Sequence, residues 1–240
     1  MLRLAMWSGP RNISTAMMRS WGNRPDTLVC DEPLYAHYLT HVDPGHPGRE
    51  EVIASGETDW RRVTRWLTDL APEGKTIFYQ KHMAHHLLPH MERDWLSKLV
   101  NCFLIREPKE MLASLDAKMG TPVLRDTGLE QQAEIFRSIC QGTGRSPAVI
   151  DSADVLRDPR RVLGALCESV GAPFTDAMLT WPPGRRDTDG IWAKYWYDAV
   201  ERSTGFEPYR ERSVTLPSRL LPLYEECRKY YEELYRGRIH

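Results

Sequence analysis

Residues 2–15, LRLAMWSGPRNIST, contain the pattern that decides the fold. The run Leu2–Trp7 is mostly apolar, which is typical of a strand covered on both faces in a parallel sheet. It ends in a turn of small, basic and hydroxyl-bearing residues, and a helix is predicted to begin at Ser14. The first N–H groups of a helix have no partner within it, and the helix dipole favours negative charge there. The stretch therefore predicts an α/β fold with an anion-binding loop after its first strand.

The loop contains several groups that suit an anion. Arg11 would add a positive charge, and the hydroxyls of Ser14 and Thr15 would add hydrogen-bond donors. Alternatively, Ser14 only caps the helix. The loop is not a Walker A motif, because Ile13 and Ser14 stand where that motif requires glycine and lysine. The candidate binding residues of the loop are Gly9, Pro10, Arg11, Asn12, Ser14 and Thr15.

Four further short apolar runs alternate with segments of helical spacing. The other predicted strands are Thr27–Cys30, Thr76–Tyr79, Val100–Ile105 and Ala148–Ile150. The predicted helices are Ser14–Trp21, Asp59–Leu70, Pro108–Lys118, Leu129–Cys140, Pro159–Val170 and Leu216–Tyr235. This alternation predicts a three-layer, P-loop NTPase-like fold: a doubly wound, mostly parallel sheet flanked by helices. The segments His37–Gly56 and Thr180–Gly190 are rich in turn-forming residues and are expected to be irregular loops.

The composition is that of an ordinary globular domain. The chain has 240 residues, and we expect one domain over residues 1–240. Its formal net charge of −1 gives no indication of a nucleic-acid or membrane partner. No run approaches the roughly 20 apolar residues of a membrane span. The five cysteines are scattered and form no CxxC pair, which favours reduced thiols and a cytoplasmic location.

The fourth predicted strand is followed by a second candidate anion site. Arg106 comes directly after Val100–Ile105, at the end of a strand where parallel sheets bind ligands. Ser114 lies nearly two turns into the following helix. Together they would hold a phosphate from the side of the crevice. Alternatively, Arg106 pairs with Glu107 or Glu110, and Ser114 has no part in binding.

The two sites together resemble those of the sulfotransferases that use 3′-phosphoadenosine 5′-phosphosulfate (PAPS). These proteins combine a loop after the first strand with an Arg-x7-Ser pair after a later one. Residues 151–174 also resemble the family's strand-to-helix segment, EDL-x-x-DP…L…L…GLPF; here it begins DSADVLRDP and ends GAPF. The resemblance covers residues 2–174, and residues 175–240 are expected to form a late loop and a C-terminal helix of the same domain.

The resemblance implies sulfuryl transfer from PAPS to an acceptor, most simply a hydroxyl of a small molecule or carbohydrate, by in-line displacement without a metal ion. The first loop would bind the 5′-phosphosulfate, and Arg106 and Ser114 would bind the 3′-phosphate. Arg11 would act in catalysis, because the leaving phosphate gains charge beside it. Many family members have lysine at this position, but arginine also binds anionic oxygens. In the late loop, Arg185 or Arg186 would close over the 3′-phosphate.

An acceptor hydroxyl also needs a base, and two residues near strand ends are candidates. Glu32 follows the second predicted strand, and a glutamate takes the proton in some members of the family. His82 follows the third, in a segment similar to the Lys-x-His of the small-molecule sulfotransferases, where the histidine is the base. Here Lys81 and His82 are adjacent, so alternation along a strand would point them to opposite faces. We favour Glu32, with His82 as the alternative; Lys81 would contact the sulfuryl oxygens or solvent.

Two other functions fit part of the pattern. Thr27–Glu32 resembles a Walker B segment and favours a P-loop nucleotide kinase or NTPase, but the Gly-Lys pair of such proteins is missing. A non-catalytic nucleotide-binding module would keep the loop without turnover. The histidines within residues 82–90 suggest zinc, but Pro89 would interrupt the helix that aligns them, so we expect no metal site. The aromatic stripe of Trp192, Tyr195 and Trp196 is expected to be part of the core; alternatively, one of its rings faces the acceptor.

Overall fold

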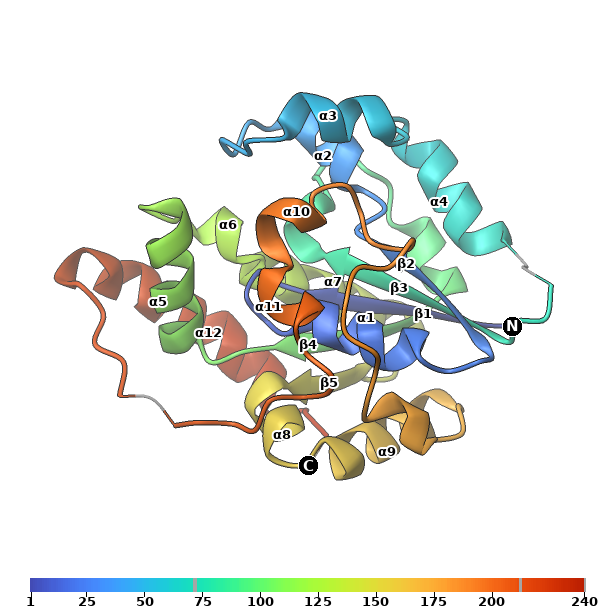
Figure 1. Ribbon diagram of the computed structural model, residues 1–240. Helices are drawn as coiled ribbons and strands as arrows, with labels where there is room; N and C mark the ends of the chain where they lie inside the picture. Colours follow the sequence, from blue (N-terminus) through green and yellow to red (C-terminus); the bar gives the residue numbers. More distant parts are fainter. Residues whose placement is uncertain (71–72, 212, 240) are drawn as a thin grey trace.

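The computed structural model describes residues 1–70, 73–211 and 213–239, and a five-stranded sheet lies at its centre (Figure 1). Neighbouring strands all pair in parallel, in the order β2-β3-β1-β4-β5. Strands β2 and β3 therefore lie on one side of β1, and the later strands β4 and β5 lie on the other. Such a reversal opens a crevice beyond the carboxyl end of the central strand, where open α/β sheets bind ligands. The strands are β1 (Leu2–Ser8), β2 (Thr27–Asp31), β3 (Ile77–Met83), β4 (Val100–Ile105) and β5 (Ala148–Asp151).

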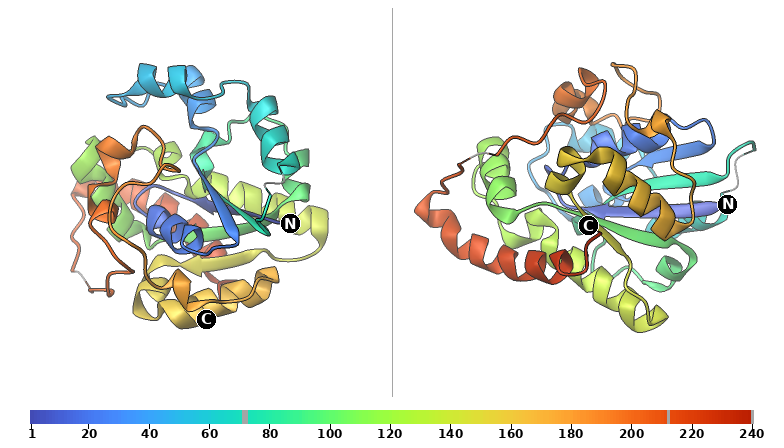
Figure 2. Two further views of the ribbon diagram at one scale, coloured as in Figure 1. Left: turned by 45° about the vertical axis from the view of Figure 1, so that its right-hand side comes forward. Right: turned by 90° about the horizontal axis from the view of Figure 1, so that it is seen from below.

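Helices cover both faces of the sheet, which confirms the predicted three-layer α/β fold (Figure 2). Helix α1 packs on β2 and β3 on one face, whereas α7 and α12 lie on the other. The longer helices are α1 (Ser14–Gly22), α4 (Trp60–Asp69), α5 (Pro108–Met119), α7 (Leu129–Thr143), α9 (Pro159–Val170) and α12 (Leu221–Tyr235). The shorter α-helices are α2 (Tyr35–His41), α3 (Arg49–Ser55), α6 (Leu124–Thr127), α8 (Ser152–Arg157), α10 (Ala193–Trp196) and α11 (Asp198–Glu201). Four 3₁₀ turns are η1 (Ala84–His86), η2 (Asp94–Lys98), η3 (Asp176–Met178) and η4 (Ser218–Leu220).

Helix α4 illustrates how the local sequence specifies an element. Its residues Trp60, Val63 and Leu67 recur at helical spacing, and all three are buried. Asp59 caps the helix, because its carboxylate accepts a hydrogen bond of 2.9 Å from the backbone N–H of Arg61. The helix thus forms close to the predicted bounds, with one apolar face on the core.

Strand β3 is longer than the sequence predicted. The expected strand ended at Tyr79, whereas β3 continues to Met83 and includes Lys81 and His82. The extension pairs with β1 up to Ser8, and β2 lies on its other side. Two paired neighbours satisfy the backbone of β3, so polar residues can continue the strand. The side chains of Lys81 and His82 consequently belong to opposite faces of the sheet.

The segment His37–Gly56 is not an irregular loop, so this prediction was wrong. It contains most of α2 and all of α3. The short α2 helix buries Tyr35, Tyr38 and Leu39, and this packing stabilises a helix whose His-, Pro- and Gly-rich surroundings gave no clear helical period. The second segment, Thr180–Gly190, contains neither a helix nor a strand, as predicted.

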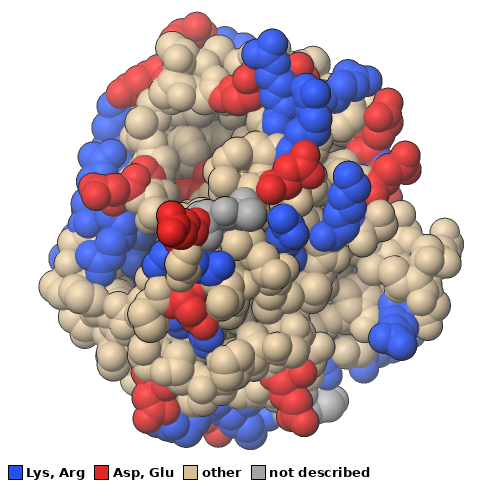
Figure 3. All heavy atoms as spheres, turned by 90° about the vertical axis from the view of Figure 1, so that its right-hand side faces the viewer, with Lys and Arg blue, Asp and Glu red and all other residues tan. Residues whose placement is uncertain are grey.

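The surface is mixed in charge. On the face that Figure 3 shows, basic and acidic side chains are interspersed without a broad patch of either sign. Within the described residues, no helix is both long enough and apolar enough to cross a membrane.

Candidate functional site

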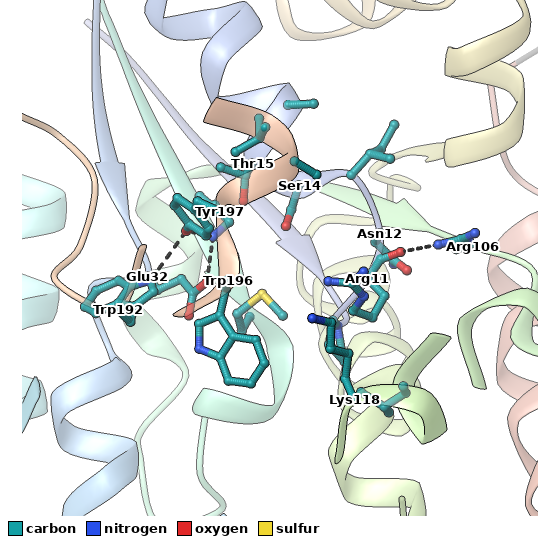
Figure 4. Close-up of a pocket in the computed structure, with 18 of the residues that line it drawn as sticks. Arg11, Asn12, Ser14, Thr15, Glu32, Arg106, Lys118, Trp192, Trp196 and Tyr197 are labelled. Atoms are coloured by element: carbon teal, nitrogen blue, oxygen red, sulfur yellow. Dashed lines mark hydrogen bonds and ion pairs between the residues drawn. The ribbon is translucent and has the colours of Figure 1, made fainter. Parts of the chain in front are cut away.

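A cavity of about 800 Å³ lies at the carboxyl end of β1 and β3. The β1–α1 loop, the residue after β2 and the end of β3 contribute to its wall, as do α10 and α11. Figure 4 shows Arg11 and Lys118 on one side of this cavity. Glu32 and the aromatic rings of Trp192 and Trp196 lie on the other side. The cavity thus has a basic half and an aromatic half, and the carboxylate of Glu32 lies in the aromatic half.

The backbone that lines this cavity is strained. Of the described non-glycine residues, three have positive φ: Arg11 at 60°, Ile13 at 54° and Glu32 at 42°. All three line the cavity. Side chains disfavour this region of backbone space, and residues held there cluster at functional sites because the surrounding structure must enforce them.

Contacts from the end of β4 and from α6 hold the β1–α1 loop in place. The Asn12 side-chain amide donates to the backbone oxygen of Leu104 at 3.0 Å, and Arg106 donates to the backbone oxygen of Arg11 at 2.6 Å. A Cβ at Gly9 would lie 2.2 Å from the backbone oxygen of Thr127, so only glycine fits there. The Asn12 amide nitrogen therefore anchors the loop to β4, and Asn12 also belongs to the lining of the cavity.

The start of α1 is open toward the cavity. Its N-cap residue is Ile13, and no side chain accepts a hydrogen bond from the first turn. The alternative in which Ser14 only caps the helix is therefore wrong. Ser14 and Thr15 line the cavity together with Pro10, and the unpaired N–H groups of the first turn favour an anion there.

The two predicted anion sites are neighbours in space. Arg11 donates from Nε to the Ser114 hydroxyl at 2.9 Å, and Arg106 also contacts the loop. Partial burial and the nearby charge of Arg106 lower the pKa of Arg11, which means that the two guanidinium groups repel each other. The expected alternative pairing of Arg106 with Glu110 is also present, at 3.0 Å. A bound anion would relieve the repulsion between the arginines.

Lys118 is a basic residue of the cavity that the sequence reasoning missed. It lies one helical turn after Ser114, and this i, i+4 spacing was the available signal. Among the described residues it forms no ion pair. The late-loop arginines are placed differently: neither Arg185 nor Arg186 lines the cavity, and the Arg186 side chain donates to the backbone oxygen of Pro182.

Glu32 belongs to a buried network on the opposite wall. The Lys81 ammonium donates to Glu32 at 2.5 Å, to Asp31 at 2.8 Å and to the Tyr197 hydroxyl at 2.7 Å. The Tyr197 hydroxyl in turn donates to Asp31 at 2.7 Å. Asp31 also accepts a hydrogen bond of 3.1 Å from the backbone N–H of Gly190. Asp31 is thus fully engaged, whereas Glu32 reaches the cavity.

The burial and the charges of this network set the pKa of the Glu32 carboxylate. Burial raises its pKa, the charge of Lys81 counteracts that effect, and the charge of Asp31 raises the pKa further. Burial alone would lower the pKa of Lys81, but Asp31 and Glu32 raise it well above its usual value. The lysine therefore stays charged, and Glu32 is a carboxylate that binds a proton more readily than an exposed one.

His82 lies away from the cavity. Its ring stacks on Trp7, with centroids 4.3 Å apart, and its Nε2 lies 3.2 Å from the side-chain oxygen of Gln80. Burial lowers its pKa to about 3. Because His82 does not line the cavity and holds a proton poorly, we retain Glu32 as the candidate base.

The aromatic half of the cavity comes from segments that are distant in the sequence. Tyr35 stacks on His86, with centroids 4.5 Å apart, and Trp192 meets the Tyr35 ring edge-on at 5.1 Å. Burial and the neighbouring His85 lower the pKa of His86 well below its usual value, so this ring is uncharged near neutral pH. The stripe at residues 192–196 packs in or against the core, as predicted, and Trp192 and Trp196 also line the cavity.

Comparison with known proteins agrees with this geometry. The model of the "Sulfotransferase domain" family matches residues 2–218. The chain belongs to this sulfotransferase domain family. The match extends past residue 174, where the resemblance seen in the sequence ended, and it includes α10 and the Trp192 and Tyr197 side chains of the cavity.

Solved sulfotransferase domains share the fold. One comes from the olefin synthase of Synechococcus PCC 7002, with a TM-score of 0.60 and 17% identity, covering 95% of this chain and 94% of that one. Another comes from the curacin biosynthetic pathway, with a TM-score of 0.61 and 17% identity, covering 98% and 97%. At this level of identity the likeness shows the fold alone.

Two curated relatives come from Arabidopsis thaliana. "Branched-chain-amino-acid aminotransferase-like protein 1" is 35% identical over 231 residues, which are 93% of this chain and 41% of the relative. "Branched-chain-amino-acid aminotransferase-like protein 2" is 33% identical over 228 residues, 95% of this chain and 40% of the relative. The chain spans less than half the length of these relatives.

Proposed function

We propose that this sulfotransferase domain transfers the sulfuryl group of PAPS to a hydroxyl of a small-molecule acceptor. One observation carries the proposal: a loop with basic side chains and a partly buried carboxylate face each other across a single cavity. A donor with a charged leaving group would occupy the basic half. The acceptor would occupy the aromatic half, with its hydroxyl between the donor and Glu32.

The basic half fits a nucleotide that carries two separate phosphates. The first turn of α1 and Arg11 would bind the 5′-phosphosulfate. Arg106 and Ser114 would bind the 3′-phosphate. The 2.9 Å contact between Arg11 and Ser114 supports this division, because residues proposed for the two subsites are direct neighbours. Lys118 adds a third positive charge beside them.

The reaction needs a proton acceptor and stabilisation of the leaving group. As the acceptor oxygen bonds to sulfur, the sulfur–oxygen bond to the 5′-phosphate breaks, and Glu32 takes the hydroxyl proton. Arg11 and the N–H groups of α1 would stabilise the charge that develops on the phosphate. The transferred group resembles neutral sulfur trioxide, so these donors can replace the metal that phosphoryl transfer needs.

The aromatic half supports a small acceptor with an apolar body. Tyr35, Trp192 and Trp196 line it with their rings, beside the ion pair of Glu32 and Lys81. Such a surface binds flat or apolar groups through burial and ring contacts. We therefore favour a hydroxylated aromatic or alicyclic molecule over a charged carbohydrate.

The kinase or NTPase alternative has less support. A Walker B carboxylate must be free to hold a magnesium ion, directly or through water. Both oxygens of Asp31 already accept hydrogen bonds, from Lys81, Tyr197 and Gly190. The Gly-Lys pair is also missing from the loop, so the loop itself suits a donor that reacts without magnesium.

A donor comparison tests this function. We expect the purified chain, given a panel of hydroxylated small molecules and sugars, to convert PAPS to adenosine 3′,5′-bisphosphate with at least one acceptor. No phosphate release from ATP with magnesium is expected. Tight binding of the bisphosphate without turnover on any acceptor would favour a non-catalytic module. Turnover of ATP, with no binding of the bisphosphate, would contradict the proposal.

Replacing Arg106 by alanine should remove the preference for a 3′-phosphate. We expect the unmodified chain to bind adenosine 3′,5′-bisphosphate at least tenfold more tightly than AMP, because a charged contact is worth about 1.5–3 kcal/mol. Arg106→Ala should bind the two nucleotides about equally, as measured by calorimetry. Arg186→Ala is the control, because this arginine lies outside the cavity, and it should keep the preference. Equal affinities in the unmodified chain would reject the 3′-phosphate site.

A further inference from the structure

Three histidines from two segments meet outside the nucleotide and acceptor cavity. His37 and His41 lie one turn apart on α2, and His90 follows the η1 turn. One ring nitrogen from each lies within 4.8 Å of those of the other two, and His37 Nε2 is 2.9 Å from His90 Nε2. His37 is buried, whereas His41 and His90 are exposed. This cluster differs from the one considered in the sequence, because His82 and His86 point elsewhere.

The hydrogen bonds of the cluster define the protonated nitrogen of two rings. His37 Nδ1 lies 2.7 Å from the backbone oxygen of Thr58. His41 Nδ1 lies 3.1 Å from the backbone oxygen of His37 and 2.8 Å from the Thr40 hydroxyl, which already donates its hydrogen to that same backbone oxygen. A carbonyl only accepts, so both Nδ1 atoms carry the hydrogen and both Nε2 atoms keep a lone pair. This is the arrangement of metal-bound histidines, whose second nitrogen donates to a carbonyl or carboxylate.

Two of the three rings, those of His37 and His90, have a lowered pKa. Burial lowers the pKa of His37, and burial with the nearby His41 lowers the pKa of His90. The 2.9 Å contact between His37 and His90 needs one proton between two nitrogens. A metal ion can replace that proton, because neutral imidazole is the form that binds metals.

We propose that His37, His41 and His90 bind one zinc ion. Zinc is held by imidazole nitrogens at about 2.0–2.1 Å, so tetrahedral ligand atoms lie roughly 3.3 Å apart. The observed separations, from 2.9 Å to within 4.8 Å, bracket this value. Small ring rotations would complete the site. Its exposed side leaves the fourth position to water.

The charges near the cluster permit a cation. Arg61 and Arg93 lie close enough to His90 to lower its pKa. Each arginine has a carboxylate partner: Arg61 pairs with Glu92 at 3.4 Å, and Arg93 pairs with Glu134 at 3.1 Å. These pairs reduce the repulsion that a divalent ion would meet.

The ion would connect two segments of the acceptor wall. Helix α2 carries Tyr35 and Tyr38, which line the cavity, and η1 supplies His86 just before His90 in the chain. A zinc ion bound outside the cavity would hold these two segments at a fixed distance from each other. This role follows from the placement of α2 and η1 and holds whatever the donor or acceptor is.

Metal titration of the untagged chain, stripped with EDTA, tests the site. Calorimetry with zinc chloride should give one ion per chain, and the Tm should rise with the logarithm of the zinc concentration. Cobalt(II) chloride should give the visible absorption of a tetrahedral complex. His41→Ala and His90→Ala, which change exposed side chains, should each weaken zinc binding at least ~10-fold and abolish the cobalt spectrum.

Cys140→Ser is the matched control, because a partly exposed thiol is the main competing zinc ligand. It should bind zinc as the unmodified chain does. Zinc binding that is equal in the unmodified, His41→Ala and His90→Ala chains would overturn the proposal. So would loss of binding in Cys140→Ser, or the absence of any zinc-dependent rise in Tm in the unmodified chain. None of these readouts depends on sulfuryl transfer.

Discussion

Glu32→Gln should lower turnover by at least ~10²-fold while adenosine 3′,5′-bisphosphate still binds normally. Glutamine keeps the shape of glutamate and can still accept a hydrogen bond from Lys81, but it cannot take a proton. Positioned bases contribute about 10²–10⁴-fold to such reactions. The measurement is kcat with saturating PAPS and any acceptor found by screening, beside calorimetry with the bisphosphate.

The pH profile should identify the same carboxylate. Burial raises the pKa of Glu32 above that of an ordinary glutamate. Only the ionised form can take a proton, so kcat should rise with pH through this raised pKa and then level off. Glu32→Gln should abolish the acid limb, because the remaining activity no longer depends on that ionisation.

Two further variants separate a base from a nearby charge. Glu207 also lines the cavity, and Glu207→Gln should leave kcat and its acid limb almost unchanged. His82→Asn should cost less activity than Glu32→Gln, since His82 lies outside the cavity. A larger loss of kcat in His82→Asn than in Glu32→Gln would identify His82 as the base. Equal, small losses of kcat in Glu32→Gln and Glu207→Gln would mean that neither of these two carboxylates acts as the base.

Lys81→Met should reduce the free energy of unfolding by about 3–5 kcal/mol at neutral pH. Methionine has a similar length, but it cannot donate to Asp31, Glu32 or Tyr197, which all contact the lysine ammonium. Removing one partner of a buried ion pair leaves the other charge unpaired, and the cost is of this size. Denaturant unfolding followed by circular dichroism measures the loss.

The stability of Lys81→Met should depend on pH in a defined direction. Without the lysine, Glu32 loses the charge that opposes the effect of burial, so its folded pKa rises further above the unfolded value. A raised pKa favours folding below the unfolded pKa, and that contribution is lost as pH rises through the folded pKa. The difference from the unmodified chain should therefore be smaller in acid and larger at neutral pH.

The exposed ion pair of Lys194 with Glu51, at 2.6 Å, provides the control. Lys194→Met should change the unfolding free energy little, because solvent screens a surface pair. If Lys81→Met is as stable as Lys194→Met, water must already reach the buried carboxylates, and the network would not hold Glu32 in place.

Much of the fold and half of the site could be predicted from local pattern. The apolar runs with intervening helical spacing predicted all five strands, because a parallel sheet needs strands that are apolar on both faces. The turn after the first strand and the Arg106–Ser114 spacing predicted the basic half. Both lie directly after strands, and the carboxyl ends of parallel strands meet at one edge.

The other half of the site could not be read in this way. Tyr197 is 116 positions from Lys81, yet their side chains are 2.7 Å apart, and no spacing rule connects them. Strand β3 was predicted too short, because its polar end is stable only between two paired neighbours. That extension turns Lys81 toward Glu32 and His82 toward Trp7, which separates the two candidate bases.

The sequence by itself therefore determined the α/β architecture, the basic loop after the first strand and the carboxylate after the second strand. These features depend on periods of two and 3.6 residues, on caps and on turns, which act over a few positions. Only the tertiary structure decided which side chains share the cavity and which histidines meet on α2 and beyond η1. Those arrangements arise from packing between distant segments, whose burial and charge set the chemistry of groups that look alike in the sequence.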